Sequence, residues 1–175
     1  ALEQLGCISW YIGDCEQAKP LLQESLAISQ AIGEYWMMQT SLQFLGFIAH
    51  AAGQHVEAQQ LYQKDYETCK QINDHYGRSL ALICLGGAAY ALGEYTQAKN
   101  LLADGLKMAT EMEYRFAIAF GLHHQGVLAY LTQTYQEAKL PLQESYKIFE
   151  ETGERRFAAL SLIYVGYVAY TLGEY

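Results

Sequence analysis

The stretch from Leu85 to Lys99, LGGAAYALGEYTQAK, decides the fold, because its features recur at a fixed distance along the chain. Glycines stand 40 residues apart at Gly6, Gly46, Gly86, Gly126 and Gly166. A second glycine column holds Gly13, Gly53, Gly93 and Gly173, with Gln133 as the departure, and an alanine column holds Ala18, Ala58, Ala98 and Ala138. Three columns in one register indicate a tandem repeat. The 175 residues therefore form a single array of four full repeats and the start of a fifth.

Each repeat is predicted to form two antiparallel helices, because apolar residues recur at helical spacing and no alternating strand pattern runs for long. The first helix of each pair, helix A, is expected over residues 35–52, 75–92, 114–131 and 155–172. The second, helix B, is expected over residues 15–32, 55–72, 95–112 and 135–152. B helices end at Gly33, Asn73 and Gly153, which accept the left-handed conformation, whereas Glu113 fills that position without such a preference. Stacking of the pairs predicts a curved all-α solenoid.

Composition excludes several classes of function. The chain carries 11 Lys and Arg against 19 Asp and Glu, a formal charge of −8, which is the wrong sign for direct binding of nucleic acid. Four cysteines without a Cys-x-x-Cys pair favour a reduced, cytoplasmic protein. The most apolar run, residues 157–173, is shorter than the about 20 residues that span a bilayer, so no membrane partner is expected.

The repeated motifs resemble tetratricopeptide repeats, whose pattern has Leu-Gly-x-x-Tyr in helix A and Ala-x-x-x-Phe in helix B. The matching segments are Leu45-Gly46-x-x-Ala49 with Ala58-x-x-x-Tyr62, and Leu85-Gly86-x-x-Ala89 with Ala98-x-x-x-Leu102. Departures are six extra residues per repeat, a small residue in place of the first Tyr, and no terminal Pro. HEAT or armadillo repeats have a similar period but do not account for the Leu-Gly column. The resemblance implies a right-handed superhelix of antiparallel helix pairs.

The 40-residue variant also looks like arrays in large bacterial signal-transduction ATPases and transcriptional regulators, on segments such as residues 22–28 and 142–148. That resemblance implies a scaffold or sensor for protein binding, in signalling or transcription regulation, within a longer cytoplasmic protein. The expected partner is a protein or peptide segment, which includes another domain of the same chain. A small-molecule sensor and a passive structural or oligomerisation spacer are the alternatives.

By the same resemblance, partners are expected on the face of helix A opposite its buried stripe. Carried over column by column, that face is an apolar and aromatic groove. It consists of Trp10, Gln43, Phe47, His50, Ile83, Tyr90, His123, Val127, Tyr130, Ile163, Tyr167 and Tyr170. The competing interpretation is that Tyr90, Tyr130 and Tyr170 only cover neighbouring helices, since aromatic stripes at helical spacing are commonly core.

Chemistry at a catalytic centre is not expected. The sequence has no phosphate-binding loop, no Gly-x-Ser-x-Gly elbow and no histidine pair at ligand spacing with a third ligand nearby, so neither catalytic residues, metal ligands nor cofactors are predicted. The last A helix would lack its B partner, so its stripe of Leu162, Val165 and Ala169 is expected to be bare. We therefore expect the array to continue in a longer chain or to self-associate through its ends.

Overall fold

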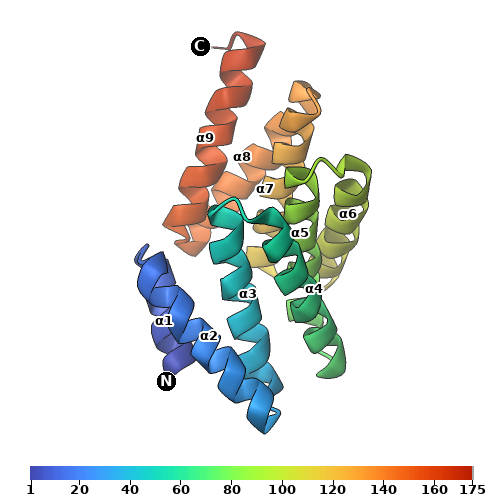
Figure 1. The fold of residues 1–175 in the computed structure, drawn as a ribbon. Helices are drawn as coiled ribbons and strands as arrows, with labels where there is room; N and C mark the ends of the chain where they lie inside the picture. The colour runs from blue at the N-terminus through green and yellow to red at the C-terminus, as the bar shows by residue number, and fades with distance from the viewer. Residues whose placement is uncertain (175) are drawn as a thin grey trace.

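A computed structural model describes residues 1–174, which form helices joined by short turns, with no strand among them (Figure 1). The helices are α1 (Leu2–Tyr11), α2 (Cys15–Ile32), α3 (Tyr35–Ala51), α4 (His55–Gln71), α5 (His75–Ala91), α6 (Tyr95–Glu111), α7 (Arg115–Leu131), α8 (Tyr135–Thr152) and α9 (Arg155–Leu172). Odd-numbered helices are A helices and even-numbered ones are B helices. The predicted helix bounds are confirmed to within one residue.

The turns that end the helices adopt the left-handed conformation at equivalent positions of successive repeats. Gly33 and Gly153 end their B helices with φ of 70° and 79°. At the equivalent positions Asn73 has φ of 56° and Glu113 has φ of 54°. Gln133, the departure from the second glycine column, has φ of 62°. The backbone shape of the repeat is therefore maintained even where the residue does not favour it.

The glycine that recurs on each A helix allows a close approach of the following B helix. A Cβ atom placed on Gly86 would lie 2.7 Å from Cγ of Leu102 and 3.3 Å from the carbonyl oxygen of Ala98. On Gly126 it would lie 2.4 Å from Cγ of Leu142. The carbonyl oxygen of the B-helix alanine also lies close, at 3.2 Å for Ala138 and Gly126. The side chain that fills the space is the leucine four residues after the alanine.

A helices form the inner layer of the array and B helices the outer layer. Each A helix contacts the next A helix, from α1 to α3 and onward to α9, whereas each B helix packs along the two A helices that flank it in sequence. Lys19 on α2 also pairs with Glu57 on α4 at 3.9 Å. The middle A helix, α5, is buried along almost its whole length. This arrangement is the solenoid that the repeat predicts.

Aromatic rings fill the centre of the solenoid. Phe47 on α3 reaches Phe120 on α7, with ring centroids 6.0 Å apart, although α5 lies between these helices in the chain. Trp10 on α1 reaches Phe157 on α9 at 6.1 Å, and the guanidinium of Arg156 donates a 2.9 Å hydrogen bond to the carbonyl oxygen of Trp10. The end of α1 accordingly lies beside the start of α9 (Figure 1). The curvature is tight enough for the inner surface to close on itself.

No helix within residues 1–174 has both the length and the apolar character needed to cross a bilayer.

Candidate interaction surface

The structure places the predicted groove residues in three different environments. Five are buried: Trp10, Ile83, Tyr90, His123 and Val127. Four are partly covered: Gln43, Phe47, His50 and Tyr130. Three are exposed, and all of these lie on α9: Ile163, Tyr167 and Tyr170. The expectation of one continuous open groove does not fit the five buried residues.

The cause is the direction in which these columns point. Ile83 of α5 approaches α7, where a Cβ atom on Gly121 would lie 3.2 Å from Cδ1 of Ile83. A Cβ atom on Gly87 would likewise lie 2.9 Å from the ring of His124. The selected columns therefore face the next A helix rather than open solvent. On α9 the same columns are exposed because no further A helix covers them in the structure.

Two of the buried groove residues belong to a polar network between A helices. The Tyr90 hydroxyl and Nδ1 of His124 share a hydrogen bond of 2.7 Å, and Nδ1 of His123 lies 3.0 Å from Oγ of Ser161. Burial lowers the pKa of His123 to about 4 and that of His124 well below its ordinary value, and burial raises the pKa of Tyr90. These side chains are neutral at pH 7, and their contacts are those of packed core groups.

The histidines do not form a metal centre with acidic or thiol side chains. In the part of the chain that the structure describes, no group of three or more His, Cys, Asp or Glu side chains is arranged to hold a metal ion. His50 and His55 lie close, with ring centroids 5.0 Å apart, and burial together with the neighbouring His55 lowers the pKa of His50 to about 4.

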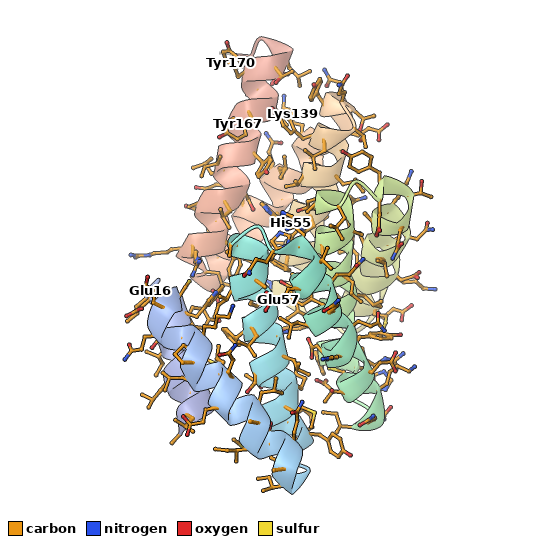
Figure 2. The ribbon with its side chains drawn as sticks, in the orientation of Figure 1. Glu16, His55, Glu57, Lys139, Tyr167 and Tyr170 are labelled. Carbon is orange, nitrogen blue, oxygen red and sulfur yellow. The ribbon has the colours of Figure 1, made fainter. Side chains whose placement is uncertain are left out.

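The exposed side of α9 is the strongest candidate for an interaction surface. We define the α9 face as Leu162, Ile163, Gly166, Tyr167 and Tyr170, whose four large side chains are about half-exposed or more. Figure 2 labels Tyr167 and Tyr170 along α9, at the end of the array. An apolar patch of this kind on one helix is typical of a surface that another helix covers.

Comparison with the inner repeats shows what the α9 face lacks. Leu162 is half-exposed, whereas Leu42 and Leu82 in the same column are buried under a B helix. A Cβ atom on Gly166 would meet nothing within 4 Å, although Gly86 in the same column is in close contact with Leu102. The expectation of a bare stripe is confirmed at Leu162. Val165 and Ala169 are partly covered.

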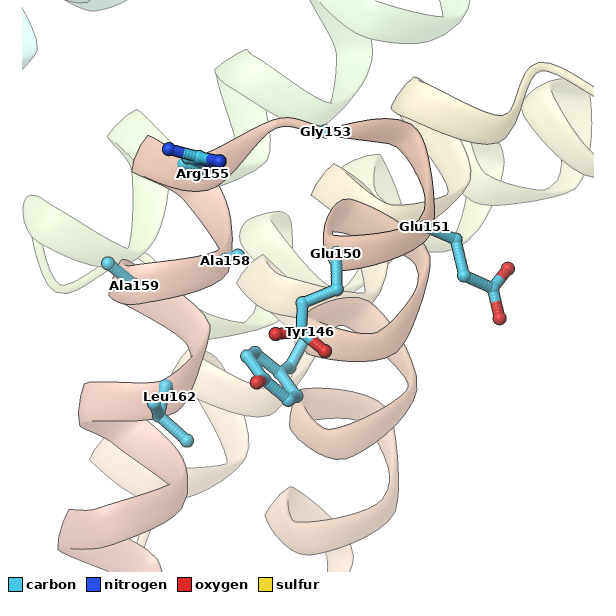
Figure 3. A pocket seen from close by; sticks show the side chains of 8 residues that line it. All are labelled: Tyr146, Glu150, Glu151, Gly153, Arg155, Ala158, Ala159 and Leu162. Atoms are coloured by element: carbon cyan, nitrogen blue, oxygen red, sulfur yellow. The ribbon is translucent and has the colours of Figure 1, made fainter.

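A cavity continues the α9 face toward the start of the helix. It has a volume of about 710 Å³ and lies between the end of α8 and the first turns of α9, with Leu162 in its wall (Figure 3). Ala158 and Ala159 line it on α9, and Tyr146 and Glu150 line it on α8, with the Glu150 side chain directed toward the Tyr146 ring. A helix lying on the α9 face would contact apolar residues of α9 and lie near the charged side chains of Glu150, Glu151 and Arg155.

The sequence prediction included Ile163, Tyr167 and Tyr170, but it grouped them into one groove with residues of other A helices that are buried. It did not include Gly166, Tyr146 or the cavity in the site. No signal in the repeat columns marks these residues, because their counterparts in the inner repeats are buried or partly covered.

Comparisons with known proteins agree with this architecture. The tetratricopeptide repeat family matches residues 36–111. Among solved structures, the apo form of RapI superposes with a TM-score of 0.75 at 14% identity, over 91% of this chain and 58% of that chain. A signal-transduction ATPase with a tetratricopeptide repeat sensor from Pyrococcus horikoshii superposes with a TM-score of 0.70 at 17% identity, over 97% of this chain and 26% of that chain.

A third structure, a Rap protein complexed with competence and sporulation factor, superposes with a TM-score of 0.54 at 15% identity, over 99% of this chain and 64% of that chain. At these identities the likeness shows the fold. This chain spans less than two thirds of the length of each of these three proteins. No match was found among curated protein sequences.

Proposed function

We propose that this chain, an array of tetratricopeptide repeats, is a non-enzymatic protein-interaction module whose α9 face binds an amphipathic helix of a protein partner. One observation carries the proposal. The column of Gly166 is covered by a B helix in each of the four preceding repeats, whereas in α9 nothing lies within 4 Å of it. The α9 face thus has the shape that receives a B helix in the inner repeats.

The chemistry of the face supports a helical partner with a defined register. Gly166 permits a leucine or an aromatic residue to approach the backbone, as Leu22, Tyr62, Leu102 and Leu142 approach the equivalent glycines. The hydroxyl groups of Tyr167 and Tyr170 lie at the end of apolar rings, an arrangement that both buries surface and fixes orientation. An apolar stripe with a large residue opposite Gly166 is therefore the partner's expected signature.

The wider setting is part of the same proposal. The fold is shared with the repeat sensor of a signal-transduction ATPase and with a Rap protein complexed with competence and sporulation factor. These likenesses support a role as the sensor or scaffold of a larger cytoplasmic signalling or transcription regulator. The partner helix then belongs either to another protein or to another domain of the same chain.

Selection of a displayed peptide library tests the proposal directly. We expect amphipathic binders on the unaltered chain that are lost on an Ile163→Glu, Tyr167→Glu variant, because two charges would be buried on binding. Leu140→Glu is the matched control, since Leu140 is exposed on α8 outside the α9 face. Thermal unfolding establishes that both variants remain folded.

The outcomes are distinct. Binders that persist on the double variant would place recognition elsewhere. Self-association that disappears in the double variant, measured by sedimentation equilibrium, would show that the α9 face is occupied by a second copy of the chain instead. The absence of any binder would favour a structural spacer.

A further inference from the structure

A cavity of about 400 Å³ lies at the junction of the third and fourth repeats, bordered by α6, α7 and α8. Its apolar floor is formed by Leu102, Leu106 and Leu128. Its remaining wall contains Ala103, Ala129 and a set of polar residues: Tyr95, Thr96, Lys99, Asn100, Gln125, Thr132, Thr134 and Glu137. We call this cavity the junction cleft. Its size and its combination of an apolar floor with polar groups on the wall are those of a small-molecule site.

Three departures from the repeat converge on the junction cleft. Ala103 stands where other B helices have Gln23, Gln63 and Gln143. Gln125 stands where Leu45 and Leu85 are buried, and Gln125 itself is exposed. Thr134 stands where the preceding and following turns have Glu94 and Glu174. Each of the three changed residues lines the junction cleft.

The change at Thr134 removes a bridge across the junction. Between the second and third repeats Nε2 of Gln59 donates a 3.3 Å hydrogen bond to Glu94, and between the last two repeats Lys139 pairs with Glu174. The equivalent residues at the junction cleft are Lys99 and Thr134. The Thr134 hydroxyl instead donates to the carbonyl oxygen of Ala129 at 3.1 Å, within its own turn.

Lys99 and Glu137 are opposite charges on the cleft walls, in the columns of Lys19 and Glu57, which pair at 3.9 Å between the first two repeats. Lys99 on α6 is exposed, whereas Lys19, Gln59 and Lys139 in the same column are partly covered. Neither Lys99 nor Glu137 of α8 lies within 4.0 Å of an opposite charge among residues 1–174. Glu137 would repel a purely anionic ligand, and Lys99 would repel a purely cationic one.

We propose that the junction cleft binds a free amino acid with an apolar side chain. The ligand's carboxylate pairs with Lys99, its ammonium group pairs with Glu137, and its side chain covers the floor of Leu102, Leu106 and Leu128. Asn100 and Gln125 supply amide donors and acceptors beside these groups. This site lies on α6 to α8 and is separate from the α9 face, so its occupation does not depend on the proposed helix partner.

Titration of the 15N-labelled chain with L-phenylalanine and with L-leucine, followed by NMR, tests the site. We expect saturable shifts confined to residues of α6, α7 and the start of α8. Glycine lacks the apolar group, N-acetyl-L-phenylalanine lacks the ammonium group and L-phenylalaninamide lacks the carboxylate. Each is expected to bind at least about tenfold more weakly, since each loses one charged hydrogen bond or the apolar contact.

Restoring the missing bridge supplies the decisive variant. Thr134→Glu places an acid opposite Lys99, as Glu174 stands opposite Lys139, and should weaken phenylalanine binding at least about tenfold. Gln54→Glu makes the equivalent change in the turn before α4 and should leave binding unchanged. Lys99→Gln changes only an exposed side chain and should also weaken binding, while its melting temperature reports that the fold is retained.

Two results would overturn the proposal: no saturable shifts with either amino acid, or phenylalanine binding that Thr134→Glu and Lys99→Gln both leave intact. Equal binding of N-acetyl-L-phenylalanine would contradict the role of Glu137. The Ile163→Glu, Tyr167→Glu variant should still bind phenylalanine, which separates a failure of this site from a failure of the α9 face.

Discussion

Asp65 is a buried carboxyl group at a position where the repeat ordinarily places a small polar residue. Ser25 and Ser145 occupy the same column, and each contacts a serine on an A helix, Ser41 at 3.1 Å and Ser161 at 3.0 Å. The A helix that follows Asp65, α5, has Ala81 at the position of those partner serines. Oδ2 of Asp65 consequently has no hydrogen bond, and burial raises the pKa of the carboxyl group to about 8.

This pKa predicts that Asp65 destabilises the fold as pH rises. An unfolded aspartate has a pKa near 3.9, so between about pH 4 and pH 8 the folded chain binds more protons than the unfolded chain, and stability falls with increasing pH. Asp65→Ser should remove this dependence. Its gain over the unaltered chain should be small at pH 4 and reach roughly 3 to 6 kcal/mol above pH 8.

Urea unfolding at pH 4, 6, 7 and 9 checks this prediction. Asp104→Ser is the control, because Asp104 is exposed on α6 and does not shift the pKa of Asp65. A stability difference between Asp65→Ser and the unaltered chain that does not grow with pH would show that Asp65 is ionised or hydrated in the folded state.

Glu113 tests the cost of the left-handed turn. Its φ of 54° is one that glycine adopts freely and that a branched or long side chain adopts at a cost of about 1 kcal/mol. Glu113→Gly should therefore raise the free energy of unfolding by roughly 0.5 to 1 kcal/mol. Gly153→Ala, at the equivalent turn with φ of 79°, should lower it by a similar amount. Chemical denaturation measures both, and opposite signs are required.

At the scale of the helix pair, the glycine column predicts a difference between two chemically identical substitutions. Gly86→Leu would drive a side chain into Leu102 and should cost roughly 1 to 3 kcal/mol. Gly166→Leu meets nothing within 4 Å and should cost less than about 1 kcal/mol, the usual range for an exposed helix site. Thermal and urea unfolding of the two variants compare them. Equal destabilisation would mean that the α9 face is already covered in solution.

Packing between helices also explains why the helices could be predicted from the sequence and the exposed surface could not. Helix bounds follow from turn residues such as Gly93 and Gly153 and from apolar spacing, both of which are local in sequence. Whether Ile83 points to solvent or to the next A helix depends on how far each repeat is rotated relative to the last. That rotation is fixed by contacts between repeats, such as Tyr90 with His124, and no single column records it.

The junction cleft was hidden for a different reason. It results from three separate departures, at Ala103, Gln125 and Thr134, that lie on three helices or turns. Each departure taken alone is an ordinary sequence difference between repeats and does not indicate a binding site. Only the structure brings them to one cavity.

At the scale of the whole molecule, contact between the first and last A helices predicts cooperative unfolding. An open solenoid holds together through neighbouring repeats only, so its ends unfold first. Here Trp10 and Phe157 contact each other from opposite ends of the sequence, and the Arg156 guanidinium lies 4.3 Å from the centre of the Trp10 ring. This contact stabilises α1 through residues that are distant in the chain.

The two tryptophans allow that prediction to be measured at one end of the array. Trp10 is 4% exposed and Trp36 is 58% exposed, so a Trp36→Phe chain carries a single buried fluorophore on α1. In urea its fluorescence transition should coincide with loss of helix measured by circular dichroism.

Adding Arg156→Ala to this chain removes the cation–π contact and a hydrogen bond, worth together about 1 to 3 kcal/mol. The Trp10 transition should then occur at a lower urea concentration than the helix transition. Arg155→Ala should leave the two transitions coincident, because the contacts with Trp10 come from its neighbour. An earlier Trp10 transition in the Trp36→Phe chain itself would mean that α1 unfolds independently and that the array behaves as an open solenoid.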